Sequence, residues 1–448
     1  MNKVHFLLGV HNHQPIGNFD FVFEKAYTRS YQPFLEAMER HPKLHWNMHG
    51  TGILWEWLED HHRDYVDRVA EQVRQGHLEI LTGGYYEPIL PSLPDADKIG
   101  QIQKLSRYIR SRFKTRAKGM WLAERVWEPQ LPKVLRAAGV EYTLVDDAHF
   151  FTTGLTPDDM TGSFLTEEQG ASLRVLPIRQ DLRYAIPFKD PGETLNLLRR
   201  HSTPWAHKAL TMFDDGEKFG LWPDTYDHVY RDGWLERFLT VLESNADWIV
   251  CSRISDYVGN NVPQGRVYLP TSSYYEMSEW TLPAPAQKSL EDLLHQFQNG
   301  TAEAAKRFVR GGYWRNFLTK YDESNAIHKK MLRVSSKVHA AVAAIDGGQA
   351  KASPRAQKML DALWAGQCNC AYWHGVFGGL YLPHLRQALY RSLLQAEVLA
   401  DKALQQDVNV VEEDFDCDGL PEVLVETPEQ NIYISPEAGG SIFEWDLR

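Results

Sequence analysis

Residues 119–129 read Gly119-Met-Trp121-Leu-Ala-Glu124-Arg125-Val-Trp127-Glu128-Pro129, so charged side chains follow directly on a short apolar run. Such a run is typical of the end of a buried strand, and Pro129 suits the opening of a following helix. Parallel barrels keep their chemistry at the carboxyl ends of their strands. The stretch therefore predicts a parallel α/β barrel in which Glu124 is a catalytic carboxylate that needs a partner elsewhere in the chain.

Short apolar runs alternate with amphipathic segments over about the first 310 residues. Strands are expected at 4–10, 44–48, 78–81, 119–122, 142–145, 173–178, 209–213 and 248–252. Helices are expected between them, for example at 21–40, 53–75, 96–113 and 228–243. This alternation favours a parallel α/β barrel of roughly seven or eight strands, and periodicity does not distinguish these two counts.

The remainder of the chain is predicted to change architecture twice. Helical spacing of apolar residues in the runs 290–308, 323–345 and 385–404 predicts a helical bundle packed on the barrel. Strand-like alternation follows at 422–426, 431–435 and 441–445. Because three strands cannot close a sandwich, we expect a β domain that is only begun here and continues beyond Arg448. The predicted domains are a catalytic barrel at 1–284, a helical bundle at 285–405 and the start of a truncated β-sandwich at 406–448.

Composition limits the classes of partner. The 448 residues carry a net charge of −11, with 43% hydrophobic and 12% aromatic residues, which describes a globular protein with an aromatic excess. The acidic balance argues against nucleic acid or an anionic membrane as a partner and suits a neutral substrate. No apolar run approaches membrane-spanning length, and the run 4–10 lacks the flanks of a signal peptide. The four cysteines form no disulfide framework, so we expect a cytoplasmic protein; its oligomeric state is not predicted.

Polar clusters stand at four of the expected strand ends. They are His11-Asn-His13-Gln-Pro15, the segment Gly76-His-Leu-Glu79-Ile leading into Thr82-Gly-Gly-Tyr-Tyr-Glu87-Pro88, the opening stretch, and Phe213-Asp214-Asp215-Gly216-Glu-Lys-Phe-Gly-Leu-Trp222-Pro223. In a parallel barrel all four would converge on one face. Two carboxylates across such a face suit glycoside hydrolysis, in which one attacks the sugar and the other protonates the leaving oxygen.

The partner of Glu124 would be Asp214 or Asp215. Gly216 lets the backbone turn sharply, so that Asp215 is presented into a cleft while Asp214 points elsewhere. A solvated turn is the alternative interpretation of this segment.

His11 and His13 allow three interpretations. Alternate residues of a strand point to one face, so both imidazoles could bind a zinc ion, with Asp146, Asp147 or His149 as a third ligand. That arrangement would indicate a metal-dependent carbohydrate deacetylase or mannosidase. The two side chains could equally bind sugar hydroxyl groups, or be structural.

These motifs resemble, in order and spacing, the first four signature regions of glycoside hydrolase family 57, and more narrowly its 4-α-glucanotransferase and α-amylase type members. The matching stretches are 11–15, 76–80, 121–124 and 213–220, followed by 269–280, 320–325 and 372–381, so the resemblance runs the whole length. It implies a (β/α)7 barrel, a following helical region, a C-terminal β domain, and retaining chemistry on α-1,4-glucans or malto-oligosaccharides that requires no cofactor.

The resemblance also implies roles for individual residues. Glu124 would be the nucleophile and Asp215 the general acid/base, and His11 and Asp214 would support the glucose subsites. The resemblance assigns no role to Arg125 and Glu128, which could form an ion pair behind the site. Substrate contacts would come from His11, His13, Glu79, Trp121, Trp222, Tyr274, Trp280, Trp373 and His374. Aromatic acceptor subsites such as Trp127, Tyr274 and Trp280 would favour sugar over water, which places glucan transfer ahead of α-amylase-type hydrolysis. Core packing is the alternative interpretation of these three rings. A non-catalytic glucan-binding protein would need a broken carboxylate pair, and both carboxylates are present.

Two further features bear on ligands. Cys370 stands where glucanotransferases of this family have an acidic residue, and a thiol cannot accept hydrogen bonds from a sugar as a carboxylate does, so donor contacts and chain-length preference are affected. Cys368 and Cys370 alone make a weak zinc motif. The acidic residues Asp414, Asp416, Asp418 and Glu422 have the spacing of a calcium loop, although Val425 at the twelfth position excludes an EF-hand. A structural calcium ion or a solvated acidic linker are both consistent with this segment.

Overall fold

The computed structural model of the chain describes residues 2–205, 207–297, 303–347 and 352–448. The chain folds into two compact units. The first contains residues 1–14 and 18–314, and the second contains residues 15–17 and 315–448. The three predicted domains stay a prediction, and the first compact unit extends past position 284 to Trp314.

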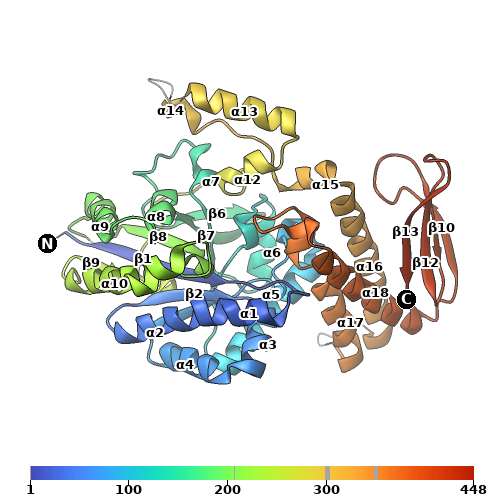
Figure 1. Cartoon of the computed structure of the whole chain (residues 1–448), viewed down its shortest axis with the longest axis horizontal. Helices are drawn as coiled ribbons and strands as arrows, with labels where there is room; N and C mark the ends of the chain where they lie inside the picture. Colours follow the sequence, from blue (N-terminus) through green and yellow to red (C-terminus); the bar gives the residue numbers. More distant parts are fainter. Residues whose placement is uncertain (1, 206, 298–302, 348–351) are drawn as a thin grey trace. The chain divides into compact units, whose positions relative to one another are not determined.

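Seven parallel strands form a nearly closed barrel in the first unit, in the order β3-β2-β1-β8-β7-β5-β4 (Figure 1). Their bounds are β1 Val4–Asn12, β2 Trp46–Gly50, β3 Leu78–Leu81, β4 Gly119–Met120, β5 Tyr142–Asp146, β7 Ala171–Ile178 and β8 Ala209–Asp215. The ring closes between β3 and β4, where the Thr82 N–H donates to the Gly119 carbonyl oxygen and the Trp121 N–H donates to the Thr82 carbonyl oxygen, at 2.9 and 2.8 Å. The predicted α/β barrel is confirmed, with seven strands.

Two further strands lie off this ring. β9, Ile249–Cys251, pairs in parallel with the start of β1, and β6, Phe164–Glu168, pairs antiparallel with β7. β9 therefore occupies the flank of β1 before β2 begins to pair with it at Gly9. This explains why the apolar run at 248–252 could not be told apart from a barrel strand by periodicity.

Apolar side chains fill the barrel interior. One cluster of buried residues joins the strands from inside: Leu7, Leu81, Trp121, Tyr142, Leu144, Leu176, Ile178, Ala209 and Phe213. Gly9 leaves the space that the Phe213 ring occupies, because a Cβ there would lie 2.2 Å from the ring. Leu7, Gly9 and His11 alternate along β1 with a period of two, which places His11 above this packed layer.

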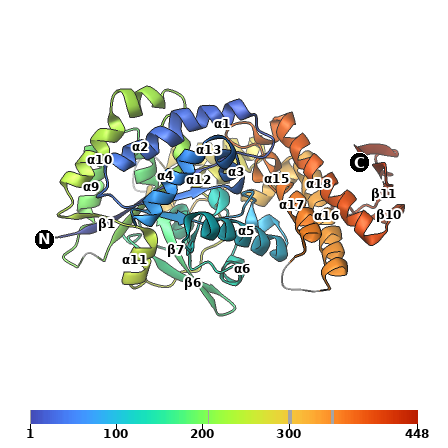
Figure 2. The same ribbon diagram turned by 90° about the horizontal axis from the view of Figure 1, so that it is seen from below.

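The helices of the first unit mostly surround the barrel, and the last two lie apart from it (Figures 1 and 2). They are α1 Asp20–Ala26, α2 Gln32–Arg40, α3 Gly52–His61, α4 Arg63–Arg74, α5 Asp95–Phe113, α6 Leu131–Ala137, α7 Ala148–Phe151, α8 Gln180–Ala185, α9 Pro191–Arg200, α10 Trp234–Ser244, α11 Ile254–Asn260, α12 Tyr275–Trp280, α13 Ala284–Gln296 and α14 Glu303–Lys306. Several predicted helices are interrupted. A π-helical turn at Tyr27–Tyr31 separates α1 from α2, and His62 separates α3 from α4. Between α13 and α14, residues 298–302 of the predicted run 290–308 lie outside the described residues.

The second unit combines helices with an antiparallel sheet. Its helices are α15 Phe317–Lys320, α16 Asp322–Asp346, α17 Pro354–Ala365 and α18 Pro383–Leu404, and its sheet has the order β10-β11-β12-β13 with bounds Asn409–Glu413, Glu422–Glu426, Gln430–Ser435 and Ser441–Leu447. The fully buried Lys330 of α16 joins the two layers through Glu397 of α18 and Glu444 of β13, at 3.5 and 3.0 Å. The predicted C-terminal β structure is confirmed, with β10 as an additional strand.

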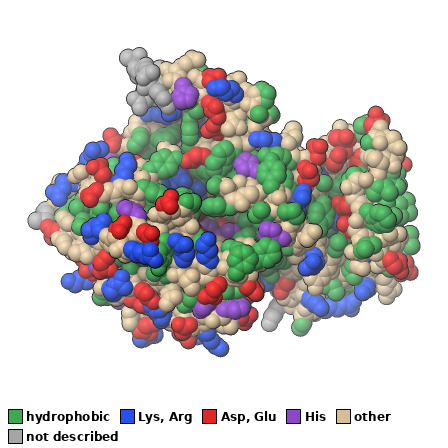
Figure 3. Space-filling view, in the orientation of Figure 1, with side chains coloured by type: hydrophobic (Ala, Val, Ile, Leu, Met, Phe, Trp, Pro, Cys, Tyr) green, Lys and Arg blue, Asp and Glu red, His purple; other side chains and the backbone are tan. Residues whose placement is uncertain are grey.

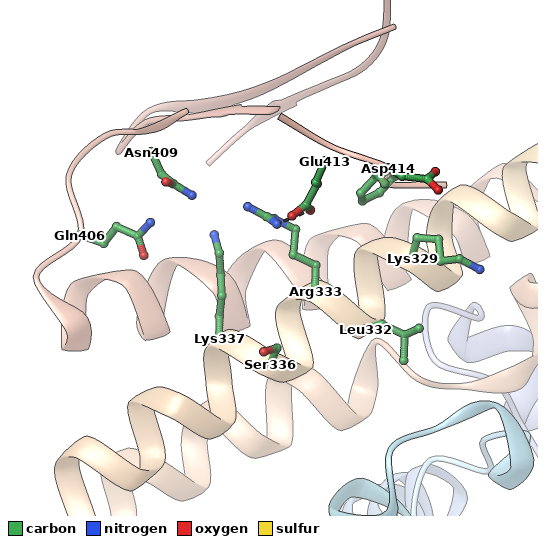
Figure 4. A pocket seen from close by; sticks show the side chains of 10 residues that line it. Lys329, Leu332, Arg333, Ser336, Lys337, Gln406, Asn409, Glu413 and Asp414 are labelled. Atoms are coloured by element: carbon green, nitrogen blue, oxygen red, sulfur yellow. Dashed lines mark hydrogen bonds and ion pairs between the residues drawn. The ribbon is translucent and has the colours of Figure 1, made fainter. Parts of the chain in front are cut away.

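A groove of about 580 Å³ lies between α16 and β10 within this second unit (Figure 4). Arg333 and Lys337 line it, and both are already paired: Arg333 with Glu413 and Glu426, and Lys337 with Glu426 at 2.8 Å. The charged side chains that line the groove therefore belong to the ion-pair network that joins α16 to the sheet.

Acidic and basic side chains are interspersed over the face shown in Figure 3. In the described part of the chain, no helix has both the length and the apolar composition needed to cross a membrane. All four cysteines are free thiols, with Cys368 buried and Cys417 exposed.

Candidate active site

Glu124 lies in a strained turn at the carboxyl end of β4. The backbone of Ala123–Arg125 forms a short 3-10 turn in which both Glu124 and Arg125 have φ near 50°. Left-handed conformations are uncommon for residues with a Cβ, and a consecutive pair persists only where surrounding contacts hold it. The Tyr274 hydroxyl donates a 2.8 Å hydrogen bond to Glu124 Oε2.

The carboxylates at the end of β8 have different surroundings. Asp214 is 2% exposed and is bound by three cations: Lys218 at 2.5 Å, Arg183 at 3.1 Å and Arg125 at 3.5 Å. Burial raises the pKa of Asp214, but the charges of Arg183, Lys218 and Arg125 outweigh burial and hold this pKa far below its ordinary value. Asp214 is therefore a permanent anion that neutralises part of the positive charge of Lys218, Arg183 and Arg125.

The side chain of Asp215, in contrast to that of Asp214, is not bound by the neighbouring cations that the structure describes. Among the described residues, none makes a hydrogen bond or ion pair with its side chain, which is only partly buried. Burial and then the charge of Asp214 raise the pKa of Asp215 above its ordinary value of 3.8. A carboxyl group that retains its proton next to a fixed anion has the property needed of a general acid.

Glu124 and Asp215 influence each other electrostatically. Burial raises the pKa of Glu124 above its ordinary value of 4.5; the charge of Arg125 opposes this rise, and the charge of Asp215 adds to it. Two carboxyl groups that disfavour each other's charge share one proton more readily than they lose both. The arrangement can therefore supply one ionised carboxylate and one carboxylic acid together.

The ion pairs of Asp214 lead to a prediction about stability. Asp214→Asn removes the anion that three buried cations share and leaves, among the described residues, only Arg183 with a second carboxylate, Asp146, so we expect the free energy of unfolding at pH 7 to fall by about 3–5 kcal/mol. Because the folded pKa of Asp214 is depressed, its stabilisation is present above the unfolded pKa and is lost as the pH falls through the folded pKa. The difference in the free energy of unfolding between the wild-type protein and Asp214→Asn should thus become smaller at acidic pH. Urea denaturation at several pH values would measure it.

The matched control for this prediction is Asp227→Asn. Asp227 forms an exposed pair with Arg231, with side chains 64% and 71% exposed, and its loss should change stability by less than about 0.5 kcal/mol. Equal effects of the two substitutions at pH 7 would contradict the role given to Asp214.

A second buried cluster is built around Glu87, a residue for which no role was predicted. Glu87 is 3% exposed and also has a left-handed backbone, with φ near 51°. Its Oε1 lies 2.8 Å from His11 Nε2 and accepts a 3.2 Å hydrogen bond from the Trp121 indole N–H, and its Oε2 contacts His13 Nδ1. One carboxylate thus orients three side chains that were predicted to bind substrate.

The charges of this cluster follow from the same contacts. Burial lowers the pKa of His11, but the charge and hydrogen bond of Glu87 and the charge of Asp215 outweigh it, so this pKa is raised. Burial and the charge of His11 hold the pKa of His49 well below its ordinary value. His11 Nδ1 lies 2.8 Å from His49 Nδ1, so a charged His11 donates this hydrogen bond to a neutral His49.

These contacts bear on the zinc alternative. His11 Nε2 and His13 Nδ1 are both directed at Glu87. The three proposed additional ligands lie in other contacts: Asp146 with Arg183 at 2.8 Å, Asp147 with the Gln180 N–H at 3.0 Å, and His149 Nε2 with the Arg125 carbonyl oxygen at 2.9 Å. Among the described residues, the two histidines thus contact Glu87, whereas Asp146, Asp147 and His149 contact Arg183, Gln180 and Arg125.

The other predicted substrate residues fall into three places. Trp121 is buried and stacks on His11 with ring centroids 4.6 Å apart, so it is a floor of the site rather than an open surface. The half-buried Trp222 lies beside Lys218, whose Nζ is 5.5 Å from the ring. Tyr274 packs against Trp280 edge to face, with centroids 5.9 Å apart, next to Glu124.

Glu79 is not brought together with Glu124 and Asp215. It accepts hydrogen bonds from the Tyr142 hydroxyl and the Ser255 N–H, at 2.6 and 2.7 Å. Its register partner on β2 is Asn47, two residues before His49, which places Glu79 nearer the amino end of the barrel. Both of its oxygens are occupied there by protein donors.

Trp373, His374 and the acidic loop belong to the second unit. The Trp373 indole N–H donates to Asn369 Oδ1 at 3.2 Å, and His374 Nδ1 lies 3.3 Å from the Tyr321 hydroxyl. In the acidic loop, carboxylate oxygens of Asp414, Asp416 and Glu422 lie within 4.8 Å of one another, whereas Asp418 is not part of this group and its N–H donates to Asp414.

Comparisons with known proteins identify the family of the chain. The family model described as glycosyl hydrolase family 57 matches residues 7–270, and a model described as alpha-amylase/4-alpha-glucanotransferase, middle domain, matches residues 312–400. The chain is 47% identical to alpha-amylase 1 of Dictyoglomus thermophilum over 100% of its own length and 63% of that relative. It is 43% identical to a 4-alpha-glucanotransferase of Thermococcus litoralis, over 99% of this chain and 64% of the relative.

A solved structure shows the same similarity. The crystal structure of 4-alpha-glucanotransferase from Thermococcus litoralis matches with a TM-score of 0.92 and 42% identity, covering 100% of this chain and 67% of that chain. The chain thus spans less than two thirds of the length of the two curated relatives named above. Since a family model covers more than half of its residues and the fold agrees, the chain belongs to glycosyl hydrolase family 57.

Proposed function

We propose that the protein is a retaining 4-α-glucanotransferase that acts on α-1,4-glucans and malto-oligosaccharides. The observation that carries the proposal is the difference between the neighbouring aspartates: Asp214 is fixed by three cations, whereas Asp215 has a raised pKa and its charge acts on Glu124. Cleavage of a glycosidic bond needs one ionised carboxylate and one carboxylic acid at the scissile bond, and these two aspartates and Glu124 can supply them.

In the first half-reaction, Glu124 is the nucleophile. An electron pair of its carboxylate attacks the anomeric carbon of the donor sugar, and the bond from that carbon to the leaving oxygen breaks. The leaving oxygen takes the bond electrons and the proton of Asp215. The products are a glucosyl ester on Glu124, an ionised Asp215 and a free sugar hydroxyl.

In the second half-reaction, Asp215 acts as the base. It takes a proton from the 4-hydroxyl of an acceptor sugar while that oxygen attacks the anomeric carbon, and the ester electrons return to Glu124. Water in place of the sugar gives hydrolysis. The ring of Trp280 beside Tyr274 provides an apolar surface on which an acceptor sugar could stack.

Hydrolysis of α-1,4-glucans is the second candidate function. The chain is 47% identical to a relative named alpha-amylase 1, against 43% for the relative named 4-alpha-glucanotransferase. Transfer is placed first because the solved glucanotransferase superposes over the whole chain with a TM-score of 0.92.

Incubation with maltotriose separates the two candidates. A ladder of longer and shorter oligosaccharides would support transfer, and glucose with maltose alone would support hydrolysis. No change in maltotriose would contradict both functions.

The pKa shifts lead to a prediction about pH dependence. The active form needs Glu124 ionised and Asp215 protonated, and burial raises the pKa of both groups. We therefore expect a bell-shaped kcat/KM profile whose acidic limb lies above pH 4.5 and whose alkaline limb is set by Asp215. The profile of Asp215→Asn should lose the alkaline limb, and an unchanged alkaline limb in that variant would contradict the assignment.

Further roles complete the proposal. His11, His13, Trp121 and Trp222 line the glucose subsites next to the catalytic pair, Trp373 and His374 contact substrate, and Arg125 supports Glu124. The residues Asp414, Asp416 and Glu422 fit a structural calcium ion, because carboxylate oxygens are its preferred ligands. The three-domain division and a cytoplasmic location belong to the same proposal.

A further inference from the structure

The segment 272–274 holds the turn that carries Glu124 through three separate contacts. Ser272 pairs antiparallel with Trp127, with N–H to carbonyl distances of 2.8 and 3.1 Å. The Ser273 hydroxyl donates to the carbonyl oxygen of Glu124. The Tyr274 hydroxyl donates to Glu124 Oε2 at 2.8 Å. These contacts explain how two consecutive residues with φ near 50° are maintained.

We propose that Tyr274 is a positioning residue of the nucleophile: its hydroxyl holds Glu124 Oε2, so that Oε1 is the oxygen presented to the anomeric carbon. The inference rests on the proposed function and goes beyond the aromatic subsite expected at this position. Among the described residues, Oε1 has no hydrogen-bond donor.

The Tyr274 ring is fixed in its own place. It is 5% exposed, the Arg125 guanidinium lies 4.3 Å above its centroid, and Trp280 contacts it edge to face. Arg125 is itself paired with Asp214. The hydroxyl therefore cannot follow a moving carboxylate freely, and the hydrogen bond restricts the rotation of Glu124.

The same hydrogen bond affects the two half-reactions unequally. A carboxylate is a stronger acceptor than the carbonyl oxygen of an ester, so the Tyr274 hydroxyl stabilises Glu124 more when it is free than when it carries the sugar. This favours departure of Glu124 from the glycosyl-enzyme in the second half-reaction. Loss of the hydroxyl should slow this departure and cause the intermediate to accumulate.

The hydroxyl also bears on the ionisation of Glu124. The charged groups that face Glu124 are Arg125 of the same turn, Asp215 at the end of β8 and Glu87 of the loop after β3. Burial raises the pKa of Glu124, and the Tyr274 hydrogen bond lowers it. Without the hydroxyl the pKa should rise further, so the acidic limb of the rate profile should move to higher pH.

The test is the Tyr274→Phe variant, which keeps the ring between Arg125 and Trp280. We expect kcat with maltotriose to fall about 10- to 100-fold, the acidic limb to move to higher pH, and a glucosyl ester on Glu124 to become detectable by mass spectrometry during turnover. Ser273→Ala keeps the Tyr274 hydroxyl, so it should leave the position of the acidic limb unchanged.

The matched control is Tyr268→Phe. The exposed Tyr268 precedes the segment 272–274, its hydroxyl donates to Glu167 of β6 at 2.8 Å, and its removal should leave turnover unchanged. A Tyr274→Phe protein with wild-type turnover and an acidic limb at the wild-type pH overturns the inference. A variant with lower turnover, but with no shift of the acidic limb and no accumulated ester, overturns it as well. Inactivity of the wild-type protein on maltotriose would instead overturn the proposed function, and the positioning role with it.

Discussion

Glu124→Gln is expected to lower kcat on maltotriose by about 10⁴-fold or more, the largest loss of any single substitution in the site. The amide keeps the size and the hydrogen-bonding shape of the side chain, but it has no ionised oxygen to attack the anomeric carbon. Product formation would be followed by chromatography of the oligosaccharides. The expected loss concerns kcat, because substrate binding does not depend on the attacking oxygen.

Two further variants test whether this loss is specific to the role of Glu124. Glu141→Gln, a surface glutamate that pairs with Arg116 at 3.1 Å, should keep wild-type activity. Glu124→Ala supplied with azide and an α-glucosyl fluoride should form a β-glucosyl azide, because azide fills the place of the missing carboxylate. Retention of more than about one hundredth of wild-type activity by Glu124→Gln would rule out Glu124 as nucleophile.

Asp215→Asn is expected to lower kcat on maltotriose by about 10²- to 10⁴-fold, with a loss that depends on the leaving group. A sugar hydroxyl leaves only with a proton, whereas fluoride leaves without one. Formation of the glycosyl-enzyme from α-glucosyl fluoride should therefore be nearly unaffected in this variant, as a burst of fluoride would show. Equal losses with both donors would contradict the assignment of Asp215 as general acid.

Asp214→Asn provides the contrast in the same dipeptide. Asp214 is held by Lys218, Arg183 and Arg125, so its loss should reduce stability and activity together, without dependence on the leaving group. The neighbouring aspartates are thus separable by experiment because their partners differ.

Much of the fold was predictable from local patterns. The strand predicted at 78–81 matches β3, Leu78–Leu81, and the helix predicted at 385–404 lies within α18, Pro383–Leu404. Helix interruptions were harder to predict, since the π-helical turn Tyr27–Tyr31 keeps the apolar spacing of its neighbours. Such a turn is specified by tertiary contacts rather than by periodicity.

The site was predictable only in part. The positions of Glu124 and Asp215 at the ends of predicted strands placed both on one face of the barrel. Periodicity predicts which way a side chain points, but it does not predict how far along the barrel axis the residue lies. Glu79 shows this limit, because its register with Asn47 places it nearer the amino end of the barrel. Glu87 was missed because its role depends on a left-handed backbone and on partners from β1 and the end of β4.

Tyr274 shows a related limit. Its aromatic ring suggested stacking on a sugar, whereas its hydroxyl is directed at the nucleophile, 150 positions earlier in the chain. No local pattern records a contact of that separation. The sequence could identify the residue as part of the site but not its partner.

Trapping the covalent intermediate tests the central claim, that Glu124 is the nucleophile, most directly. Asp215→Asn would be mixed with α-glucosyl fluoride, quenched in acid, digested and examined by mass spectrometry. We expect one glucosyl unit esterified to Glu124, absent when Glu124→Gln is added to the same protein. An ester on another carboxylate, or release of fluoride with no ester at all, would contradict that role.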